Sequence, residues 1–230
     1  KGKLFSKSAT PKSFLGLLDW AQKKLWKPVQ EVEDSTFKVI CHDFYYKKTV
    51  ERIESFLKSR SIKDGEMTIN DEKVPALKTL LDQIDFDWLC TSRQTFFHGD
   101  FILDNIIETE DGFRLLDWRQ NFGGLLQAGD LYYDLSKLNH NLTVNHGIIN
   151  DNLFTITVHG DKIFCDILRK ENLVQCQNVL MDFLAQNGYD IKKTKILTAL
   201  IWLNMSPLHH HPFDLFLFYF GKLNLWKALR

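Results

Sequence analysis

The sequence predicts a mainly helical α+β protein that forms one domain over residues 1–230. Apolar residues recur at helical spacing through most of the chain, the most distinctive short apolar strands fall in one segment near its middle, and no repeat or long linker divides it. A hydrophobic fraction of 44% and a charged fraction of 25% are typical of a soluble globular protein that can bury a sizeable core.

Three amphipathic segments predict the helices of the first part of the chain. Residues 14–26 carry apolar side chains at helical spacing, with a proline just beyond them. Residues 43–60 and 74–84 show the same periodicity. Between these two, residues 66–74 alternate around a turn-prone Asn-Asp pair, which predicts a short hairpin.

The pattern changes to strands near the middle of the chain. Residues 95–100, 105–110 and 113–118 are short and apolar, and Asp111-Gly112 is expected to form the turn between the last two. This small β insert contains the residues of greatest chemical interest.

Helices are expected again in the second half. Residues 129–142 form a helical pattern, and the chain from about Leu173 onward is helical and increasingly aromatic. Residues 153–168 favour either a hairpin or a passage from strand to helix, with His159-Gly160-Asp161 at its turn.

The stretch HGDFILDN contains the strongest functional pattern. His98-Gly99-Asp100 is followed at the fifth position by Asn105, and Asp117 comes at the end of the next expected hairpin. Phosphoryl transfer from a nucleotide requires a carboxylate that orients the acceptor hydroxyl and hard oxygen ligands that hold magnesium against the phosphates. Protein kinases place an aspartate, an asparagine and a second aspartate in this order and at this spacing.

A second His-Gly-Asp sequence, at residues 159–161, lacks the rest of the pattern. The fifth residue after Asp161 is Asp166 rather than asparagine, and no metal-binding aspartate follows on a matching hairpin. We therefore interpret this copy as an ordinary turn, in which glycine and aspartate supply the backbone conformations that a turn needs.

The segments HGDFILDN, LLDW and GDLYYDL together resemble the aminoglycoside phosphotransferase and choline kinase family, whose members have a protein-kinase-like fold. The resemblance is specific over residues 96–138 and looser over the flanking helices. It is closest to the phosphotransferases of bacterial capsule and cell-surface sugar biosynthesis.

The resemblance implies a role for each residue of the pattern. Asp100 would be the catalytic base, and Asn105 and Asp117 would bind Mg²⁺ and, through it, the nucleotide. His98 would support the catalytic loop, and Asp134 would be a structural anchor beneath it. The phosphoryl donor would be ATP or GTP.

Three departures from related kinases bear on the acceptor. Gly99 replaces the arginine that couples the catalytic loop of protein kinases to a phosphorylated activation loop, and few residues separate Asp117 from Asp134. We therefore expect a small-molecule acceptor. Arg119 stands where the resembled family usually has glutamate. It suits an anionic acceptor such as a sugar phosphate, although a surface salt bridge to a nearby carboxylate is the more usual role of such a residue.

The resemblance also divides the chain. Residues 1–95 would form the hinge and first helices of the large, C-terminal lobe of a kinase, residues 96–120 its catalytic and metal-binding loop and hairpin, and residues 121–230 a helical acceptor-side subdomain. No glycine-rich strand-turn-strand precedes Phe96. We expect the N-terminal lobe to be missing from this chain, and to be either absent or part of a larger upstream polypeptide.

Other residues near the C-terminus and in the loop are weaker candidates. Asp104 could touch magnesium or acceptor, or cap its own loop. His209 and His210 could line the acceptor pocket, and metal binding by this histidine cluster is disfavoured because adjacent histidines cannot all face one ion. The late aromatic residues could form a cage for a quaternary ammonium, but their helical spacing favours a core.

The sequence thus predicts a phosphotransferase that acts on an alcohol group of a sugar, an amino alcohol or a surface-polymer precursor. The alternatives are a non-catalytic kinase-like binding module and a magnesium-dependent phosphohydrolase. A formal net charge of zero argues against a general nucleic-acid binder. Four cysteines without paired spacing fit a reducing cytoplasm, and the apolar runs are too short to span a membrane.

Overall fold

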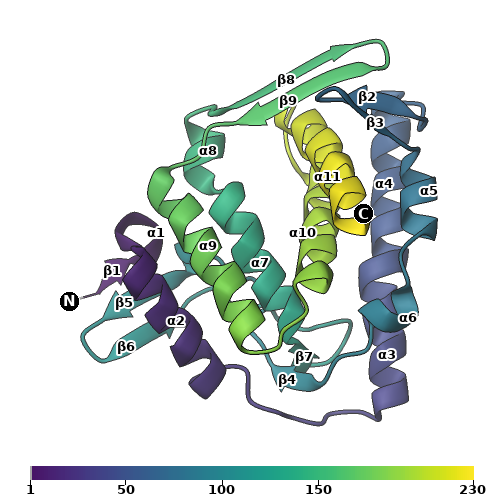
Figure 1. Ribbon diagram of the computed structural model, residues 1–230. Coiled ribbons are helices and arrows are strands. Elements are labelled where there is room, and N and C mark those ends of the chain that lie inside the picture. Colours follow the sequence, from purple (N-terminus) through teal and green to yellow (C-terminus); the bar gives the residue numbers. More distant parts are fainter. Residues whose placement is uncertain (1) are drawn as a thin grey trace.

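Helices dominate the computed structural model of the protein, which describes residues 2–230, and short strands lie at its edges (Figure 1). This confirms a mainly helical α+β fold. The helices are α1 Phe5–Ser8, α2 Pro11–Lys24, α3 Asp34–His42, α4 Lys48–Arg60, α5 Leu77–Asp82, α6 Phe86–Leu89, α7 Leu131–Thr143, α8 His146–Asn150, α9 Glu171–Gln186, α10 Ile191–Met205 and α11 Phe213–Leu229, with a π-helical turn η1 Asp43–Lys47 and 3₁₀ turns η2 Leu103–Asn105 and η3 Ser206–Leu208.

Helix α2 begins earlier than the apolar spacing suggested. The side chain of Thr10 accepts a hydrogen bond from the backbone of Ser13, whose own side chain accepts one from the backbone of Thr10, and Pro11 occupies the first turn. Such a capping box satisfies backbone donors that the first turn leaves free. The polar residues before Phe14 therefore belong to the helix.

The helix predicted over residues 43–60 is longer than expected and interrupted. It starts at Asp34 as α3, passes through the π-helical turn η1, and continues as α4. A π turn inserts an extra residue into the helical register and is common at functional sites. Within this turn, Phe44 packs on Phe122 at 4.4 Å between ring centroids, and the hydroxyl of Tyr45 donates to Asp130 at 2.8 Å.

The strands of the middle segment are shorter than predicted and belong to two sheets. In the first sheet, β5 Ile106–Thr109 lies between β1 Lys3–Leu4 and β6 Gly112–Leu115. In the second, β4 Gln94–Phe96 pairs with β7 Ala128–Asp130. The β5–β6 turn is formed by Glu110-Asp111 rather than Asp111-Gly112, because Gly112 already pairs with Thr109.

A third sheet joins two hairpins that are far apart in the sequence. The predicted hairpin of residues 66–74 forms β2 Met67–Ile69 and β3 Glu72–Val74, and β2 pairs in parallel with β9 Lys162–Ile167, which pairs with β8 Phe154–His159. Figure 1 shows this sheet across one end of α11. Of the two alternatives for residues 153–168, the hairpin is confirmed, with the second His-Gly-Asp sequence at its turn.

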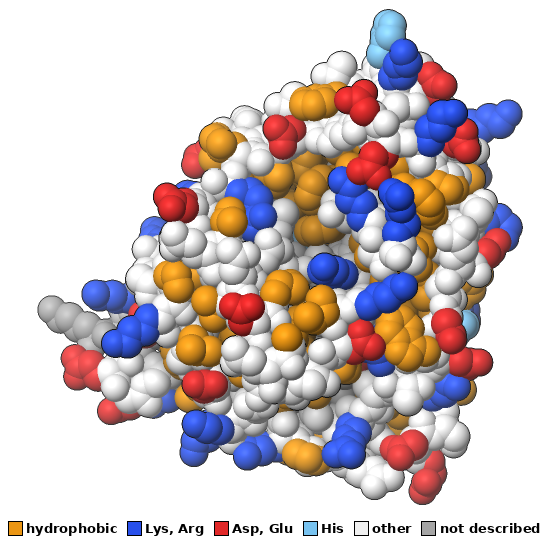
Figure 2. Space-filling model, viewed as in Figure 1, with side chains coloured by type: hydrophobic (Ala, Val, Ile, Leu, Met, Phe, Trp, Pro, Cys, Tyr) orange, Lys and Arg blue, Asp and Glu red, His pale blue; other side chains and the backbone are white. Residues whose placement is uncertain are grey.

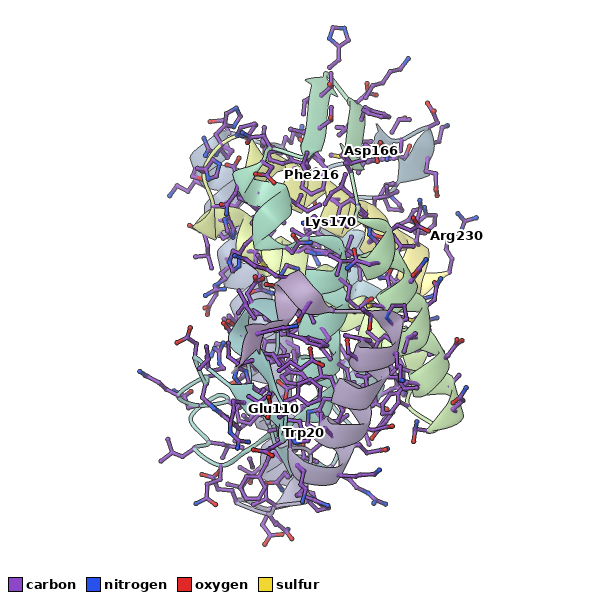
Figure 3. All side chains as sticks on the ribbon, turned by 90° about the vertical axis from the view of Figure 1, so that its left-hand side faces the viewer. Trp20, Glu110, Asp166, Lys170, Phe216 and Arg230 are labelled. Carbon is purple, nitrogen blue, oxygen red and sulfur yellow. The ribbon has the colours of Figure 1, made fainter. Side chains whose placement is uncertain are left out.

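The aromatic residues of the last helices form core rather than an open cage. Phe213, Phe216 and Phe218 are fully buried, and Phe216 packs on Phe154 of β8 at 5.3 Å between ring centroids. Figure 3 shows Phe216 behind the base of the β8–β9 hairpin, and Trp20 of α2 beside the β5–β6 hairpin that carries Glu110. The helices thereby hold the middle segment in place.

Two further expectations concern the cysteines and the length of the apolar helices. All four cysteines are buried free thiols. No helix within residues 2–230 is both long and apolar enough to cross a bilayer.

Candidate active site

The His98-Gly99-Asp100 loop is anchored from below by Asp134. One carboxylate oxygen of Asp134 accepts the backbone N–H of His98 at 2.8 Å and the indole N–H of Trp26 at 3.0 Å, and the other accepts the backbone N–H of Gly99 at 2.7 Å. Burial raises the pKa of Asp134 to about 6, and these three donors oppose the shift. These hydrogen bonds tie α7 to the backbone of the loop and to Trp26 of the segment after α2.

The imidazole of His98 connects the two halves of the site. It is buried, its Nδ1 accepts the backbone N–H of Asp100 at 3.2 Å, and its Nε2 lies 2.7 Å from the carbonyl oxygen of Leu116. Since Nδ1 accepts, Nε2 carries the proton and donates. Burial also lowers the pKa of His98, which favours this neutral form. One ring therefore fixes both the loop of Asp100 and the segment that leads into Asp117.

The carboxylate of Asp100 is held from two sides. Lys137 Nζ of α7 lies 2.7 Å from its Oδ1, and Asn105 Nδ2 donates to its Oδ2 at 3.1 Å and to its backbone carbonyl at 3.0 Å. The Asp100 side chain remains 40% exposed. A carboxylate that is oriented and still reachable can accept or orient the proton of a hydroxyl group.

Asn105 and Asp117 line the same cavity as Asp100, which has a volume of about 340 Å³. Because Asn105 donates its Nδ2 hydrogens to Asp100, its Oδ1 is left as a possible ligand. Asp117 lies just beyond β6 with a positive φ of 51°, a left-handed conformation that a non-glycine residue adopts at some energetic cost. Strain of this kind is common where a backbone turn aims a side chain at a site.

This donor set suits a magnesium ion. One amide oxygen and one carboxylate are hard ligands, and Mg²⁺ typically takes only one or two protein ligands while retaining waters and nucleotide phosphates. Within residues 2–230, no group of three or more histidine, cysteine, aspartate or glutamate side chains is arranged to hold a metal. A metal at Asn105 and Asp117 would therefore need the phosphates of a nucleotide to complete its coordination.

Gly99 is required where the protein-kinase pattern has arginine. Its φ of +81° is left-handed, and a Cβ atom there would lie 2.5 Å from Cβ of Arg119 and 2.7 Å from the ring of Phe97. Arg119 reaches this position because its backbone N–H donates to the carbonyl of His98 at 3.0 Å. The loop therefore packs directly against Arg119.

The expectation of a surface salt bridge for Arg119 is wrong. Its Nε donates to the carbonyl of Asn121 at 2.9 Å, and its guanidinium lies 5.0 Å from the ring centroid of Phe44 and 6.0 Å from that of Tyr133. Among the ion pairs within residues 2–230, none includes Arg119. The positive charge faces a second cavity instead.

The weaker candidates occupy different places. Asp104 does not line the cavity of Asp100; its Oδ2 accepts from Asn141 at 3.4 Å and lies 3.1 Å from Nδ1 of His146, which ties the loop to its neighbours. His209 lines the cavity, whereas His210 lies outside it and packs beside Phe213. Burial lowers the pKa of His209.

Sequence reasoning missed Lys137 and His140, which both line the cavity from α7. The sequence could have indicated Lys137, because this residue follows Asp134 by three positions and therefore lies on the same face of the helix. His140 is buried, and its Nδ1 has no hydrogen-bond partner among the described residues.

Comparison with known proteins adds little to this geometry. No family model matches the sequence. No curated protein matches it. The chain is similar to a solved structure described as glucosamine kinase (crystal form B), with 12% identity and a TM-score of 0.48, over 98% of this chain and 55% of that one. It thus spans about half the length of that protein, and a likeness this weak does not establish a shared fold.

Proposed function

We propose that this chain is a phosphotransferase that moves the γ-phosphoryl group of a magnesium nucleotide, ATP or GTP, to an alcohol group of a small molecule. The observation that carries the proposal is the placement of Asp100. Its carboxylate is fixed by Lys137 and Asn105 and lies at the same cavity as Asn105 and Asp117. The acceptor classes that fit the sequence resemblance are a sugar, an amino alcohol or a surface-polymer precursor.

Each residue has a role that its contacts support. Asn105 and Asp117 would hold a magnesium ion, which when bound neutralises charge on the nucleotide phosphates. Asp134 and His98 keep the loop and the Asp117 segment in register through hydrogen bonds of 2.7–3.2 Å. Asp100 is the group left to meet the acceptor.

The transfer step uses Asp100 to orient the acceptor hydroxyl. The hydroxyl oxygen forms a bond to the γ-phosphorus while the bond from that phosphorus to the β,γ-bridging oxygen breaks. The nucleoside diphosphate leaves with that electron pair, and the hydroxyl proton passes to the carboxylate of Asp100. Lys137, at 2.7 Å from Oδ1, holds the carboxylate of Asp100 in position before transfer.

Nucleotide binding to the full chain provides the first test. Calorimetry with ATP should show binding that requires Mg²⁺ and weakens at least about tenfold in Asp117→Asn, because a metal–carboxylate contact is lost. Asparagine tolerates the left-handed backbone of position 117, so this variant removes charge without adding strain. Asp182→Asn, at an exposed position of α9, is the matched control. Equal binding by Asp117→Asn and the wild type would refute the metal assignment.

The alternatives give different outcomes. A non-catalytic module predicts no turnover of ATP with any hydroxyl acceptor even where magnesium ATP binds. A phosphohydrolase predicts release of phosphate from phosphate esters without ATP. The phosphotransferase predicts ATP-dependent phosphorylation that Asp100→Asn reduces at least about a hundredfold while nucleotide affinity is retained.

A further inference from the structure

A second cavity, of about 200 Å³, adjoins the site and is lined by four cationic side chains. These come from three parts of the fold: Lys48 and Arg52 from α4, Arg119 from the segment after β6, and Lys137 from α7. No acidic residue lines it among those that the structure describes. We name these four side chains the basic cleft.

Among the described residues, three of the four cations of the basic cleft have no acidic partner, whereas Lys137 pairs with Asp100. Lys48 Nζ lies 4.4 Å from the centroid of the Phe44 ring, and the guanidinium of Arg119 lies over the same ring. Among the described residues, Arg52 donates a hydrogen bond only to the carbonyl of Asn204, at 3.3 Å. Burial, followed by the charges of Arg119, Arg52 and Lys137, lowers the pKa of Lys48 to about 8. Like charges brought together in this way destabilise a fold unless an anion joins them.

Lys137 connects the basic cleft to the catalytic loop. It lines both cavities and contacts Asp100, whereas Asn105 and Asp117 line only the cavity of Asp100. Lys137 contacts Oδ1 of Asp100 and Asn105 contacts Oδ2, so the basic cleft and the residues suited to the metal nucleotide meet this carboxylate at different oxygens. An acceptor held in the cleft would reach Asp100 from the side away from the metal ligands.

We propose that the basic cleft binds an anionic group of the acceptor, and that the acceptor is a phosphate ester of a sugar or another polyol. Arginine guanidinium groups match phosphate oxygens with paired hydrogen bonds, and two lysines add point charges. The inference rests on the proposed function, since it assigns the anion to the acceptor of that reaction. It also gives Arg119 an anionic partner, which no described residue supplies.

Another group of cations on the surface is less suited to this role. Figure 2 shows Lys and Arg side chains around a hollow on the face that carries α9, α10 and α11. The cavity between these helices, of about 570 Å³, is lined by Arg169, Lys195 and Lys227. Lys227 pairs with Glu72 at 3.1 Å, and Arg169 donates to Gln177 at 2.8 Å. Lys195 at this cavity offers a control cation for the experiment.

The test measures binding of inorganic phosphate and of glycerol 3-phosphate to the full chain, with glycerol as the neutral probe, by NMR titration at low ionic strength. Both phosphates should bind and glycerol should not. Arg52→Gln and Arg119→Gln should each weaken binding at least about tenfold, because a charge-assisted hydrogen bond is lost. Lys195→Gln should bind as the wild type.

Two results would overturn the inference: binding unchanged in both arginine variants, or binding lost in Lys195→Gln. Failure of the proposed function has a different signature. If magnesium ATP binds in a way that depends on Asp117 but phosphate does not bind at the cleft, only the inference of an anionic acceptor is refuted. If phosphate binds in a way that depends on Arg119 but magnesium ATP does not bind, only the proposed phosphotransferase function is refuted. Asp117→Asn should leave phosphate affinity unchanged in either case.

Discussion

Lys137 and Asp100 form an ion pair of 2.7 Å that joins helix α7 to the His98-Gly99-Asp100 loop. The Lys137 side chain is only 13% exposed, whereas that of Asp100 is 40% exposed, so the carboxylate is the more accessible partner of the pair. The same lysine lines the basic cleft. Among residues 2–230, it is the one side chain that contacts the proposed base and lines the proposed acceptor site.

Removal of Lys137 should affect turnover more than folding. We expect Lys137→Gln to lower kcat at least about tenfold, since Asp100 loses the charge that orients it, and to raise KM for an anionic acceptor. Lys137→Arg should restore part of both, because the charge is retained. Steady-state kinetics with each variant test this, and an unchanged kcat in Lys137→Gln would contradict the positioning role.

Loss of the Asp134 anchor should destabilise the fold. Asp134→Ala leaves the N–H groups of His98, Gly99 and Trp26 buried without their acceptor, which should reduce the free energy of unfolding by about 3 kcal/mol. Urea denaturation measures the change. Asp182→Asn, which lacks such contacts, should stay within about 0.5 kcal/mol of the wild type.

Two glycines should respond in opposite directions to alanine. Gly99→Ala should destabilise by about 1–3 kcal/mol, because its φ is +81° and the new Cβ would lie 2.5 Å from Arg119. Gly16 lies in α2, and no neighbouring atom comes within 4 Å of the place that an alanine methyl group would occupy, so Gly16→Ala should stabilise by about 0.5–1 kcal/mol. Thermal unfolding of both variants tests the contrast, and equal effects would contradict the strain at Gly99.

Stability should fall as the pH drops from about 7 to 6. Burial lowers the pKa of His98 and, further, of His140 below the ordinary value of 6.5. Between these pKa values and 6.5 the unfolded chain binds more protons than the folded one, so the free energy of unfolding decreases with decreasing pH. Asp134, with a pKa raised to about 6, acts in the opposite direction below that pH.

The histidine contribution can be isolated by substitution. His140→Phe should flatten the decline between pH 7 and 6, whereas His159→Gln, at an exposed turn, should leave it as in the wild type. Urea denaturation across this range supplies the comparison. A slope that is the same in all three proteins would show that His140 does not control it.

Anion binding at the basic cleft should weaken as the pH rises. Burial and the charges of Arg119, Arg52 and Lys137 lower the pKa of Lys48 to about 8, so Lys48 loses its charge between pH 7 and 9. Phosphate affinity should decrease from pH 7 to 9 in the wild type. Lys48→Gln should bind more weakly at pH 7 and lose most of this pH dependence, and a wild-type decline that persists in Lys48→Gln would exclude Lys48 as its source.

Local sequence pattern was a good guide where the cause is local. The helices and hairpins follow the periodicity of their apolar residues, and the second His-Gly-Asp sequence lies at a hairpin turn as its flanking alternation predicted. The sequence-based predictions were wrong about where some helices begin and where one is interrupted. The cap at Thr10 and the π turn at Asp43–Lys47 depend on hydrogen bonds that apolar periodicity does not encode.

The sequence by itself determined the order and spacing of His98, Asp100, Asn105 and Asp117, and one short loop and one hairpin suffice to bring the last three to a common cavity. Tertiary structure alone decided what surrounds them. Lys48, Arg119 and Lys137 belong to segments that meet only when α4 and α7 pack around the loop, and their convergence is a property of that packing. Contacts between distant segments depend on the whole core, so no local pattern could predict the charge of the cleft.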